Sequence, residues 1–432
     1  MSRSNCLSAL IMLSLTACFA GPIAHASTVV VGTCKAGVHF STIQAAVNAS
    51  PAGGTVDVCP NSYSEQVMIT KNLTLIGIAA GISDAAVVVP PAGGLISNGS
   101  DIFGNPVAAQ IFVQGADVTV SHLTVDGSNN QLSGCGAPNP IGIYYQNSSG
   151  KITDDAVRNV LMDPADQGCQ LGLAINVESN TGAPAITISD NSVRNYDKNG
   201  ITVTGPDTGA AGPDATVTSN TVIGLGATAA TAQNGIQIGY GATGSVATNN
   251  VVDDIYINPP SCGGNSEPPC YGSSGILIYG SAGITVTSNT VESTQLGIVP
   301  ATASATLTAN GTVIKMNRVG GTQNYDALDL CSDGNTAQSN VIYGSAESGI
   351  HLDDSCSPST GSNTTVNANT VNESCAGILI GPSSTSNSIG TNTFMNVSNT
   401  TLAGDSCTPL AGAQAAVRHQ SLRPSPHKSN AK

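Results

Sequence analysis

The chain has 432 residues, of which only 9% are charged and 3% are aromatic, and it contains no Trp. Its formal net charge is −14, from 13 Lys and Arg against 27 Asp and Glu. So few positive charges argue against direct binding of nucleic acid or another bare polyanion, which leaves neutral glycans, or anions bridged by a divalent cation, as partners.

The first 26 residues are typical of an export signal. Arg3 precedes an apolar stretch at 7–19, and small residues at 24–26 form a cleavage site. The stretch is too short to count as a spanning helix, and we expect no membrane span elsewhere. Soluble export is favoured, while a bacterial lipobox at 15–18 is the alternative and would place a lipid anchor on Cys18. We therefore expect a secreted, periplasmic or cell-surface protein.

Residues 27–77 predict an N-terminal cap. The stretch 39–47 has the period of a short amphipathic helix, with Ser41 as N-cap and Ile43, Ala46 and Val47 on one face. Strand-like runs follow it within the same segment. A helix lying across the end of a stack of strands would cover their unpaired edges.

Two repeats then run side by side along the chain. A Gly-Ile pair, or a close equivalent, returns nine times with a shortest interval of 22 residues, and an Asn two places before an apolar residue returns eight times. Each repeat has two short runs rich in Val, Ile and Thr, with alternate positions apolar, which is typical of strands. We expect each Gly to mark a corner before an inward Ile. The pairs begin at Gly142, Gly172, Gly200, Gly235, Gly275, Gly297, Ala327, Gly349 and Gly377, and the asparagines are Asn191, Asn220, Asn250, Asn289, Asn317, Asn340, Asn369 and Asn392.

Self-similarity at this interval predicts a solenoid, because one repeat cannot bury its own apolar face. No helical period separates the strands, so the fold class is all-β: a right-handed parallel β-helix of about 12 coils, with strands roughly 4.8 Å apart. We expect one domain over 27–411, a monomer, and a disordered basic tail at 412–432. A stacked column of Asn amides can satisfy its own hydrogen bonds, so we interpret these residues as structural.

The start of the mature chain resembles the opening of the pectin-lyase-like superfamily. The segments that carry the resemblance are Phe-Ser-Thr-Ile-Gln-Ala-Ala-Val at 40–47, Pro-Asn-Ser-Tyr-Ser-Glu at 60–65 and Leu-Thr-Leu-Ile-Gly at 73–77. Pectinesterases and many uncharacterised right-handed β-helix proteins begin in this way. The resemblance implies the fold and leaves the activity open.

The catalytic motifs of the characterised enzymes do not accompany this opening. Polygalacturonases are similar to this region in placing acidic residues and a His on successive coils, and Asp353 with Asp354 resembles their paired aspartates, but their Asn-Thr-Asp, Ser-His-Gly and Arg-Ile-Lys elements are missing. Pectinesterases need an Arg-Trp pair, which a chain without Trp lacks. Pectate lyases need a basic residue, for which Lys315 and Arg318 are the candidates. The resemblance therefore implies an uncharacterised β-helix repeat protein rather than a true pectinesterase.

Ten of the 12 Cys follow the export signal. An even number of Cys in an exported chain indicates disulfides. The sequence contains no Cys-x-x-Cys pair that would suggest a metal thiolate site. We expect consecutive pairing, in which the pairs are Cys34 with Cys59, Cys135 with Cys169, Cys262 with Cys270, Cys331 with Cys356, and Cys375 with Cys407.

In-register stacking converts sequence positions into columns. If Leu328 and Ile350 point inward, Asp329 and His351 point outward and are immediate neighbours on adjacent coils. Tyr144 occupies the same outward column several coils away. Together with four nearby aspartates, Asp329 and His351 form the densest group of titratable residues in the chain.

Carboxylates beside an imidazole can supply general acid and base for glycosidic cleavage, or bind Ca²⁺. The alternative is that these aspartates make side-chain turns at corners and that the His is an exposed spacer. On the functional interpretation, the catalytic residues are Asp329, His351, Asp353 and Asp354, the substrate-binding residues are Tyr144 and Asp326, and Asp333 is a metal ligand.

Two functions remain open. The first is an exported protein that binds or processes a polysaccharide, with lyase, hydrolase or epimerase chemistry at the Asp/His cluster. The second is a non-catalytic β-helix of the cell surface or periplasm that serves as a binding or structural module. A copper-delivery protein with this fold is disfavoured, because Met and His residues are few and scattered.

Overall fold

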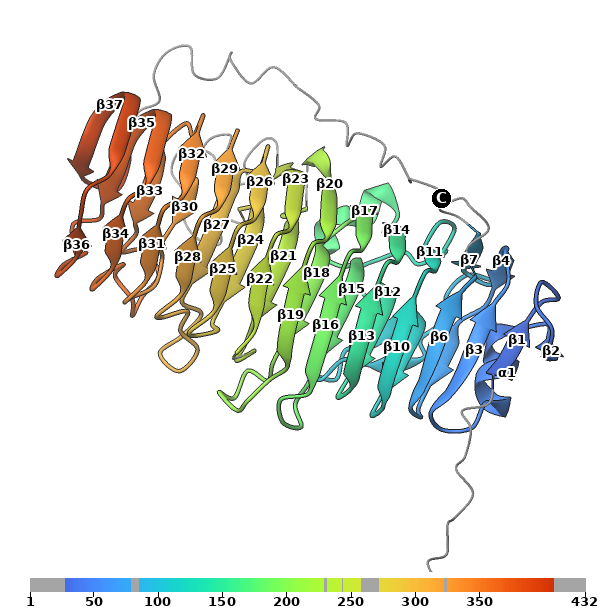
Figure 1. The fold of residues 1–432 in the computed structure, drawn as a ribbon. Coiled ribbons are helices and arrows are strands. Elements are labelled where there is room, and N and C mark those ends of the chain that lie inside the picture. Colours follow the sequence, from blue (N-terminus) through green and yellow to red (C-terminus); the bar gives the residue numbers. More distant parts are fainter. Residues whose placement is uncertain are drawn as a thin grey trace, which may run out of the picture.

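The computed structural model describes residues 28–78, 85–228, 231–242, 244–257, 272–321 and 325–407. They form the predicted right-handed parallel β-helix, in which strands from successive coils lie side by side along one axis (Figure 1). The export signal, the boundary at residue 411, the basic tail, and Cys262 and Cys270 lie outside the described residues. A helix long and apolar enough to cross a membrane is not found in the described ranges.

Except in the last two described coils, each coil has three strands, not the two that the sequence suggested. In one coil β16 (Ala185–Ser189) is followed by β17 (Ser192–Tyr196) and β18 (Asn199–Thr204), and each pairs in parallel with its counterpart in the next coil. The Gly-Ile pair lies inside the third strand. That strand was missed because the sequence interpretation assigned the pair to a corner.

The first strands of the coils form a 14-stranded sheet, and all of its members except β1 and β2 come from successive coils, in agreement with about 12 coils. In sheet order they are β2 (Val38–Phe40), β1 (Thr28–Val31), β3 (Gly54–Val58), β6 (Leu73–Gly77), β10 (Asp117–Ser121), β13 (Ser149–Thr153), β16, β19 (Asp214–Thr218), β22 (Val246–Thr248), β25 (Thr285–Thr287), β28 (Val313–Lys315), β31 (Thr336–Gln338), β34 (Thr365–Asn367) and β36 (Ser388–Ile389).

The second and third strands belong to one 23-stranded sheet, because β35 (Thr370–Ile380) and β37 (Thr393–Ala403) run continuously through both positions. The second strands are β4 (Asn61–Ser64), β7 (Ala86–Val89), β11 (Thr124–Asp126), β14 (Ala156–Val160), β17, β20 (Thr221–Thr228), β23 (Val251–Ile257), β26 (Thr290–Glu292), β29 (Arg318–Gly320) and β32 (Val341–Tyr343). The third strands are β5 (Val67–Ile69), β9 (Pro106–Gln114), β12 (Asn139–Gln146), β15 (Leu173–Glu178), β18, β21 (Asn234–Gly239), β24 (Ser274–Tyr279), β27 (Leu296–Ala301), β30 (Leu328–Asp329) and β33 (Ser348–Leu352), and the short β8 (Gly99–Ser100) pairs antiparallel with β9.

The capping helix α1 (Ile43–Ala49) is present, and a 3-10 helix η1 (Pro164–Cys169) is the other helical element of the described residues. The N-cap of α1 is Thr42, whose Oγ1 accepts from the backbone N–H of Ala45 at 3.2 Å, so the expectation of Ser41 was one residue off. Glu65 accepts from the first two helical N–H groups, at 2.7 and 2.9 Å. The second segment of the superfamily-like opening therefore holds the helix by its N-terminus.

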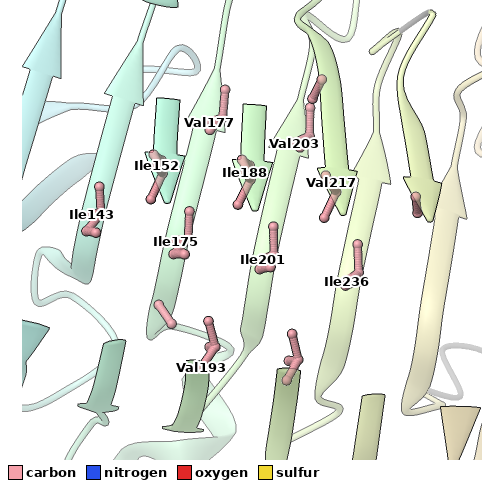
Figure 2. Packing of buried hydrophobic residues seen from close by; sticks show 14 of the residues in the cluster. Ile143, Ile152, Ile175, Val177, Ile188, Val193, Ile201, Val203, Val217 and Ile236 are labelled. Carbon is pink, nitrogen blue, oxygen red and sulfur yellow. The ribbon is translucent and has the colours of Figure 1, made fainter. Parts of the chain in front are cut away.

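Inward columns of Ile and Val fill the interior. Figure 2 shows Ile143, Ile175, Ile201 and Ile236 on four consecutive third strands, facing residues of the first strands such as Ile188. Those four are fully buried. Complete burial of one such side chain stabilises the fold by about 1.5–3 kcal/mol, so the repeated column is the main source of cohesion.

The two sequence repeats interlock between adjacent coils. A Cβ added at Gly200 would lie 2.4 Å from Cγ1 of Val222, and one added at Gly235 would lie 2.3 Å from Cγ1 of Val252. These Val residues belong to the Asn-x-Val repeat, so the Gly makes room for them and does not mark a corner. Gly172 is the exception: its φ of 92° is left-handed, and it lies outside the register of the other pairs.

The recurrent Asn residues form the predicted hydrogen-bonded ladder. Asn220, for example, donates from Nδ2 to Oδ1 of Asn250 at 2.9 Å and to the carbonyl of Ile188 at 2.9 Å, and its own Oδ1 accepts from Asn191. The same amide-to-amide bond links each rung to the next as far as Asn392. At the N-terminal end the equivalent position is Asp155, whose N–H donates to Oδ1 of Asn191 at 3.0 Å.

Four of the five expected disulfides are present among the described residues. They join Cys34 to Cys59, Cys135 to Cys169, Cys331 to Cys356, and Cys375 to Cys407. The consecutive pairing is therefore confirmed wherever the structure describes both partners.

Candidate functional site

One outward column runs along the third strands and changes character along the axis. The register aligns aromatic residues on β9 and β12, polar residues on β15, β18 and β21, and apolar residues on β24 and β27, before it reaches an Asp and a His. The members from β9 onward are Phe112, Tyr144, Asn176, Thr202, Gln237, Leu277, Val299, Asp329, His351, Leu379 and Leu402.

Tyr144 points outward as predicted, but it is completely buried. Its ring stacks on Phe112 with 4.7 Å between the ring centres, and its hydroxyl donates to Oε2 of Glu178 at 2.7 Å. Gln146 donates to the carbonyl of Ser100 beside this pair, so the segment around β8 covers the face. No ring face remains for a sugar. The covering segment has no counterpart in the repeat, and the column alone could not reveal it.

Asp329 and His351 are register partners on β30 and β33, as the column predicted. Asp326, which precedes β30, receives a hydrogen bond from Ser348 Oγ at 2.5 Å on one carboxylate oxygen. Its other oxygen lies 3.1 Å from Nδ1 of His351. The imidazole is therefore fixed by a buried carboxylate of the adjacent coil, which leaves Nε2 as its free atom.

Two buried atoms of this cluster have no hydrogen-bond partner, Oδ1 of Asp329 and Nε2 of His351. The His is 6% exposed, whereas the Asp is partly exposed even though this one oxygen is not. Buried polar atoms are nearly always satisfied, because leaving one unpaired costs about 1–3 kcal/mol. These two unpartnered atoms belong to register partners on adjacent strands of the outward column.

The cluster shifts the pKa values of its members. Burial alone would lower the pKa of His351, but its hydrogen bond to Asp326 and the charges of Asp326, Asp329 and Asp353 raise it to about 10. Burial, and then the charge of Asp353, raise the pKa of the Asp329 carboxyl well above its usual value, against the opposing effect of the imidazole. The His is thus cationic at neutral pH, and Asp329 tends to keep its proton.

Glu347 is a member of the cluster that the sequence interpretation missed. Burial, followed by the charge of Asp326, raises its pKa to about 7. Its Oε1 also accepts from the backbone N–H of Cys407 at 3.1 Å, which ties it to the C-terminal coil. The signal was available in the register, since Glu347 directly precedes Ser348, the residue that pairs with Asp326 across the coils.

The remaining predicted residues separate into two groups. Asp353 receives hydrogen bonds from Ser355 in a side-chain turn, but it is also hydrogen bonded to Asp329. Asp354 accepts from the N–H of Ser383 at 2.6 Å, and Asp333 accepts from two N–H groups of a neighbouring loop. The last two carboxylates stabilise corners, as the structural alternative expected, and neither joins the cluster around the imidazole.

Two groupings of potential metal ligands occur within the described ranges, with one ligand atom per residue and all atoms within 4.8 Å of each other. The first contains Asp326, Asp329 and His351, and the second contains Asp329, Cys331 and Asp353. The sulfur of Cys331 is in a disulfide and therefore offers no thiolate. A metal at this place would depend on carboxylates and one imidazole.

An aromatic row lies on the same face beside the outward column. Tyr279 packs edge-on against Tyr240 at 5.4 Å, and Tyr240 packs edge-on against Phe103 at 6.1 Å between ring centres. Phe103 is 43% exposed, and the two tyrosines are partly exposed. Tyr279 lies two residues after Leu277 on β24. In the parallel register it pairs with Ala301 on the next coil, and Ala301 pairs with Cys331 on the coil after that. Unlike Tyr144, these rings reach solvent.

Comparison with other proteins agrees with this architecture. The family model described as "Periplasmic copper-binding protein (NosD)" matches residues 266–409, the part that contains the Asp/His cluster. Among solved structures, a lacto-N-biosidase of Eubacterium ramulus in its selenomethionine form matches with a TM-score of 0.56 at 11% identity, over 86% of this chain and 67% of that one. A mannuronan C-5 epimerase A-module of Azotobacter vinelandii matches with a TM-score of 0.49 at 15% identity, over 85% and 94%.

No curated protein matches the sequence. At such low identity the structural likeness establishes the fold alone. The chain is a right-handed parallel β-helix.

Proposed function

We propose that this protein is exported, that it binds a polysaccharide along the outer face of its third strands, and that it acts on this glycan at the cluster of Asp329, His351, Asp353 and Glu347. The observation that carries the proposal is the pair of unpartnered buried atoms, Oδ1 of Asp329 and Nε2 of His351, on adjacent coils of an outward column. Export is supported by the disulfides, which persist in oxidising compartments.

The binding surface is the stretch of the outer face from β21 to β33. Gln237, Leu277, Tyr279 and Asp329 are partly exposed on it, whereas Thr202 on the coil before is buried. Four coil steps of roughly 4.8 Å make this surface about 19 Å long. A mixture of amide, aromatic and aliphatic side chains suits a sugar ring, which has both polar edges and apolar faces.

The chemistry would use the shifted groups as acid and base. Glycosidic cleavage needs one group that protonates the leaving oxygen and a second that accepts a proton or attacks. Asp329 holds a proton because its pKa is raised, so it is assigned as the acid. Glu347, with a pKa of about 7, is assigned as the base. The cationic His351, held by Asp326, would stabilise developing negative charge.

A non-catalytic binding protein is the second candidate. It is favoured by the deep burial of His351 and Asp326, which leaves only the carboxyl groups at the rim in contact with solvent. The lacto-N-biosidase of the same fold acts, by its name, on a glycan, and the family matched by residues 266–409 is described as copper-binding. Fold likeness does not decide between catalysis and binding.

The test is turnover by the mature chain on a panel of neutral and acidic polysaccharides, with reducing ends and unsaturated products both followed. We expect turnover that falls by a factor of about 10² or more in Asp329→Asn and in Glu347→Gln, the range typical for the loss of a general acid or base. Asp190→Asn is the matched control, because Asp190 is an exposed residue at a left-handed corner that Asn also tolerates. Binding without turnover would favour the second candidate, and unchanged turnover in both site variants would exclude this cluster from catalysis.

A further inference from the structure

We propose that Phe103, Tyr240 and Tyr279 form a glycan-binding subsite apart from the Asp/His cluster, and that this subsite selects an uncharged polysaccharide over a polyuronate, a chain of uronic acid sugars. The inference rests on the proposed glycan binding and names the class of glycan. It does not depend on which residues carry out the chemistry, because the three rings take no part in it.

The three rings come from separate parts of the chain and meet on one face. Tyr279 ends β24, Tyr240 directly follows β21 on the preceding coil, and Phe103 lies in the turn between β8 and β9. Their ring centres are 5.4 and 6.1 Å apart, packed edge to face. In the register of the third strands Tyr279 lies between Gly239 and Ala301. Neither neighbour has a side chain large enough to cover the ring, which leaves room beside it for a ligand.

The backbone of Tyr240 is held in a conformation that Tyr rarely adopts. Its φ of 52° is left-handed, which is unfavourable for a residue with a bulky side chain. The other non-Gly residues with a left-handed φ in the described ranges are mostly Asn, Asp and Ser, small polar residues that are common at turns. Backbone strain of this kind is concentrated at ligand-binding and catalytic sites. A Tyr at this corner therefore indicates a use for its ring that the fold itself does not require.

The charges on this face determine the class of glycan. None of the Lys and Arg residues in the described ranges lies on a third strand. Burial, the neighbouring Tyr279 and the charge of Asp207 raise the pKa of Tyr240, so a carboxylate lies near its ring. Asp101 lies in the turn that carries Phe103, where it accepts from the N–H of Phe103 at 3.0 Å. A polyuronate would bring a further carboxylate with every sugar and would be repelled, whereas a neutral chain would not.

Aromatic side chains suit a neutral sugar, because they contact its apolar face without any charge and a Tyr hydroxyl can bond to its polar edge. The rings also lie within reach of the cluster. Two coil steps separate β24 from β30, or roughly 10 Å. The imidazole of His351 is buried and held by Asp326, so its charge does not neutralise a uronate bound over the rings. A glycan chain along the axis could contact the rings while another of its sugars reaches Asp329.

Affinity electrophoresis measures binding separately from turnover. The full mature chain is run in native gels that contain β-glucan, xylan or galactomannan as neutral polysaccharides, or polygalacturonate or alginate as polyuronates. We expect retardation by at least one neutral polysaccharide and by neither polyuronate. Tyr279→Ala and Tyr240→Asn should each weaken the neutral binding by about 3–10-fold. Tyr343→Ala is the matched control, because it removes a partly exposed ring from the second strand β32, outside the aromatic row.

Tyr240→Asn also separates a binding role from a structural one. Asn tolerates a left-handed backbone better than Tyr does, so the variant should keep the melting temperature of the parent chain while it loses affinity. A fall in both would assign the ring to packing and would overturn its part in the subsite. Tyr279→Ala, which does not change this corner, gives a second measurement of the same subsite.

Two results would overturn the subsite: binding to a polyuronate alone, or neutral binding that is unchanged in both Tyr variants. Turnover of any glycan by the parent chain in either case would leave the proposed function standing without this subsite. Neutral binding that depends on the rings, without turnover, would support the subsite and count against catalysis at the cluster. No binding to any of the five polysaccharides and no turnover would overturn both proposals.

Discussion

Replacing Asp155 with Asn should stabilise the protein by extending the amide ladder by one rung. In the structure Asp155 accepts from the N–H of Leu123 through Oδ1 at 2.8 Å, but its Oδ2 is buried without a partner. An amide at this place would donate from Nδ2. By the register, its acceptors would be Oδ1 of Asn191 and the carbonyl of Val120, the counterpart of Ile152, whose carbonyl accepts from Asn191.

The magnitude follows from these two hydrogen bonds. Each contributes a net of about 0.5–1.5 kcal/mol, so Asp155→Asn should raise the free energy of unfolding by about 1–3 kcal/mol at pH 8. Burial raises the pKa of Asp155 well above its usual 3.8. The stability that depends on its protonated form is therefore present below pH 3.8 and is lost as pH rises through the folded-state pKa. The advantage of Asn over Asp should accordingly grow with pH.

Urea denaturation of both proteins at pH 4 and pH 8 measures this difference. Asn220→Asp is the matched control of opposite sign, because it removes the bonds from Nδ2 to Ile188 and to Asn250 and sets a carboxylate against an amide oxygen. It should destabilise the protein by about 1–3 kcal/mol or more. A neutral or destabilising Asp155→Asn at pH 8, or a difference that does not depend on pH, would refute the account of the ladder.

Three further outcomes are expected. Gly235→Ala should lower the melting temperature, at a cost of about 1–3 kcal/mol in unfolding free energy, because the new Cβ would lie 2.3 Å from Val252, and Val252→Ala in the same chain should restore part of the loss. His351 has a pKa raised from 6.5 to about 10, so the stability that it contributes is present below pH 6.5 and lost as pH rises through 10; stability curves of the parent and of His351→Gln should converge over that interval, and parallel curves would count against the shift. Glu65→Ala removes two charge-assisted hydrogen bonds to the N–H groups of α1 and should cost about 1–3 kcal/mol in urea denaturation, whereas an unaffected transition midpoint would show that the helix does not depend on this carboxylate.

The sequence could predict the neighbours along the axis but not what covers the outer face. The adjacency of Asp329 and His351 followed from the period alone, because in-register strands repeat every coil. The burial of Tyr144 did not, since the segment around β8 that covers it is an insertion without a repeat. The Gly of each Gly-Ile pair was also misassigned, because Gly is common at corners and only packing shows that it makes room for a Val.

The cluster itself shows the same limit. Asp333, Asp353 and Asp354 each lie within a few residues of Asp329 or His351 in sequence, and that proximity gave no reason to separate them. Their partners separate them: loop N–H groups engage Asp333 and Asp354, whereas Asp353 meets Asp329. Glu347 was overlooked because it lies outside the outward column, although its pKa is raised to about 7. The repeat therefore predicts contacts within a column, but it does not predict contacts between neighbouring columns.

A stack of coils comes apart from its ends, since each coil is held only by the ones beside it. The bond between Cys34 and Cys59 ties down the first coil, and the bond between Cys375 and Cys407 ties down the last one described. These two disulfides cross-link the two ends at which unfolding of the stack would begin. In a reducing environment the coils would then unfold one after another from the ends before the middle of the β-helix unfolds. The same chain would therefore be stable outside the cell and unstable within it.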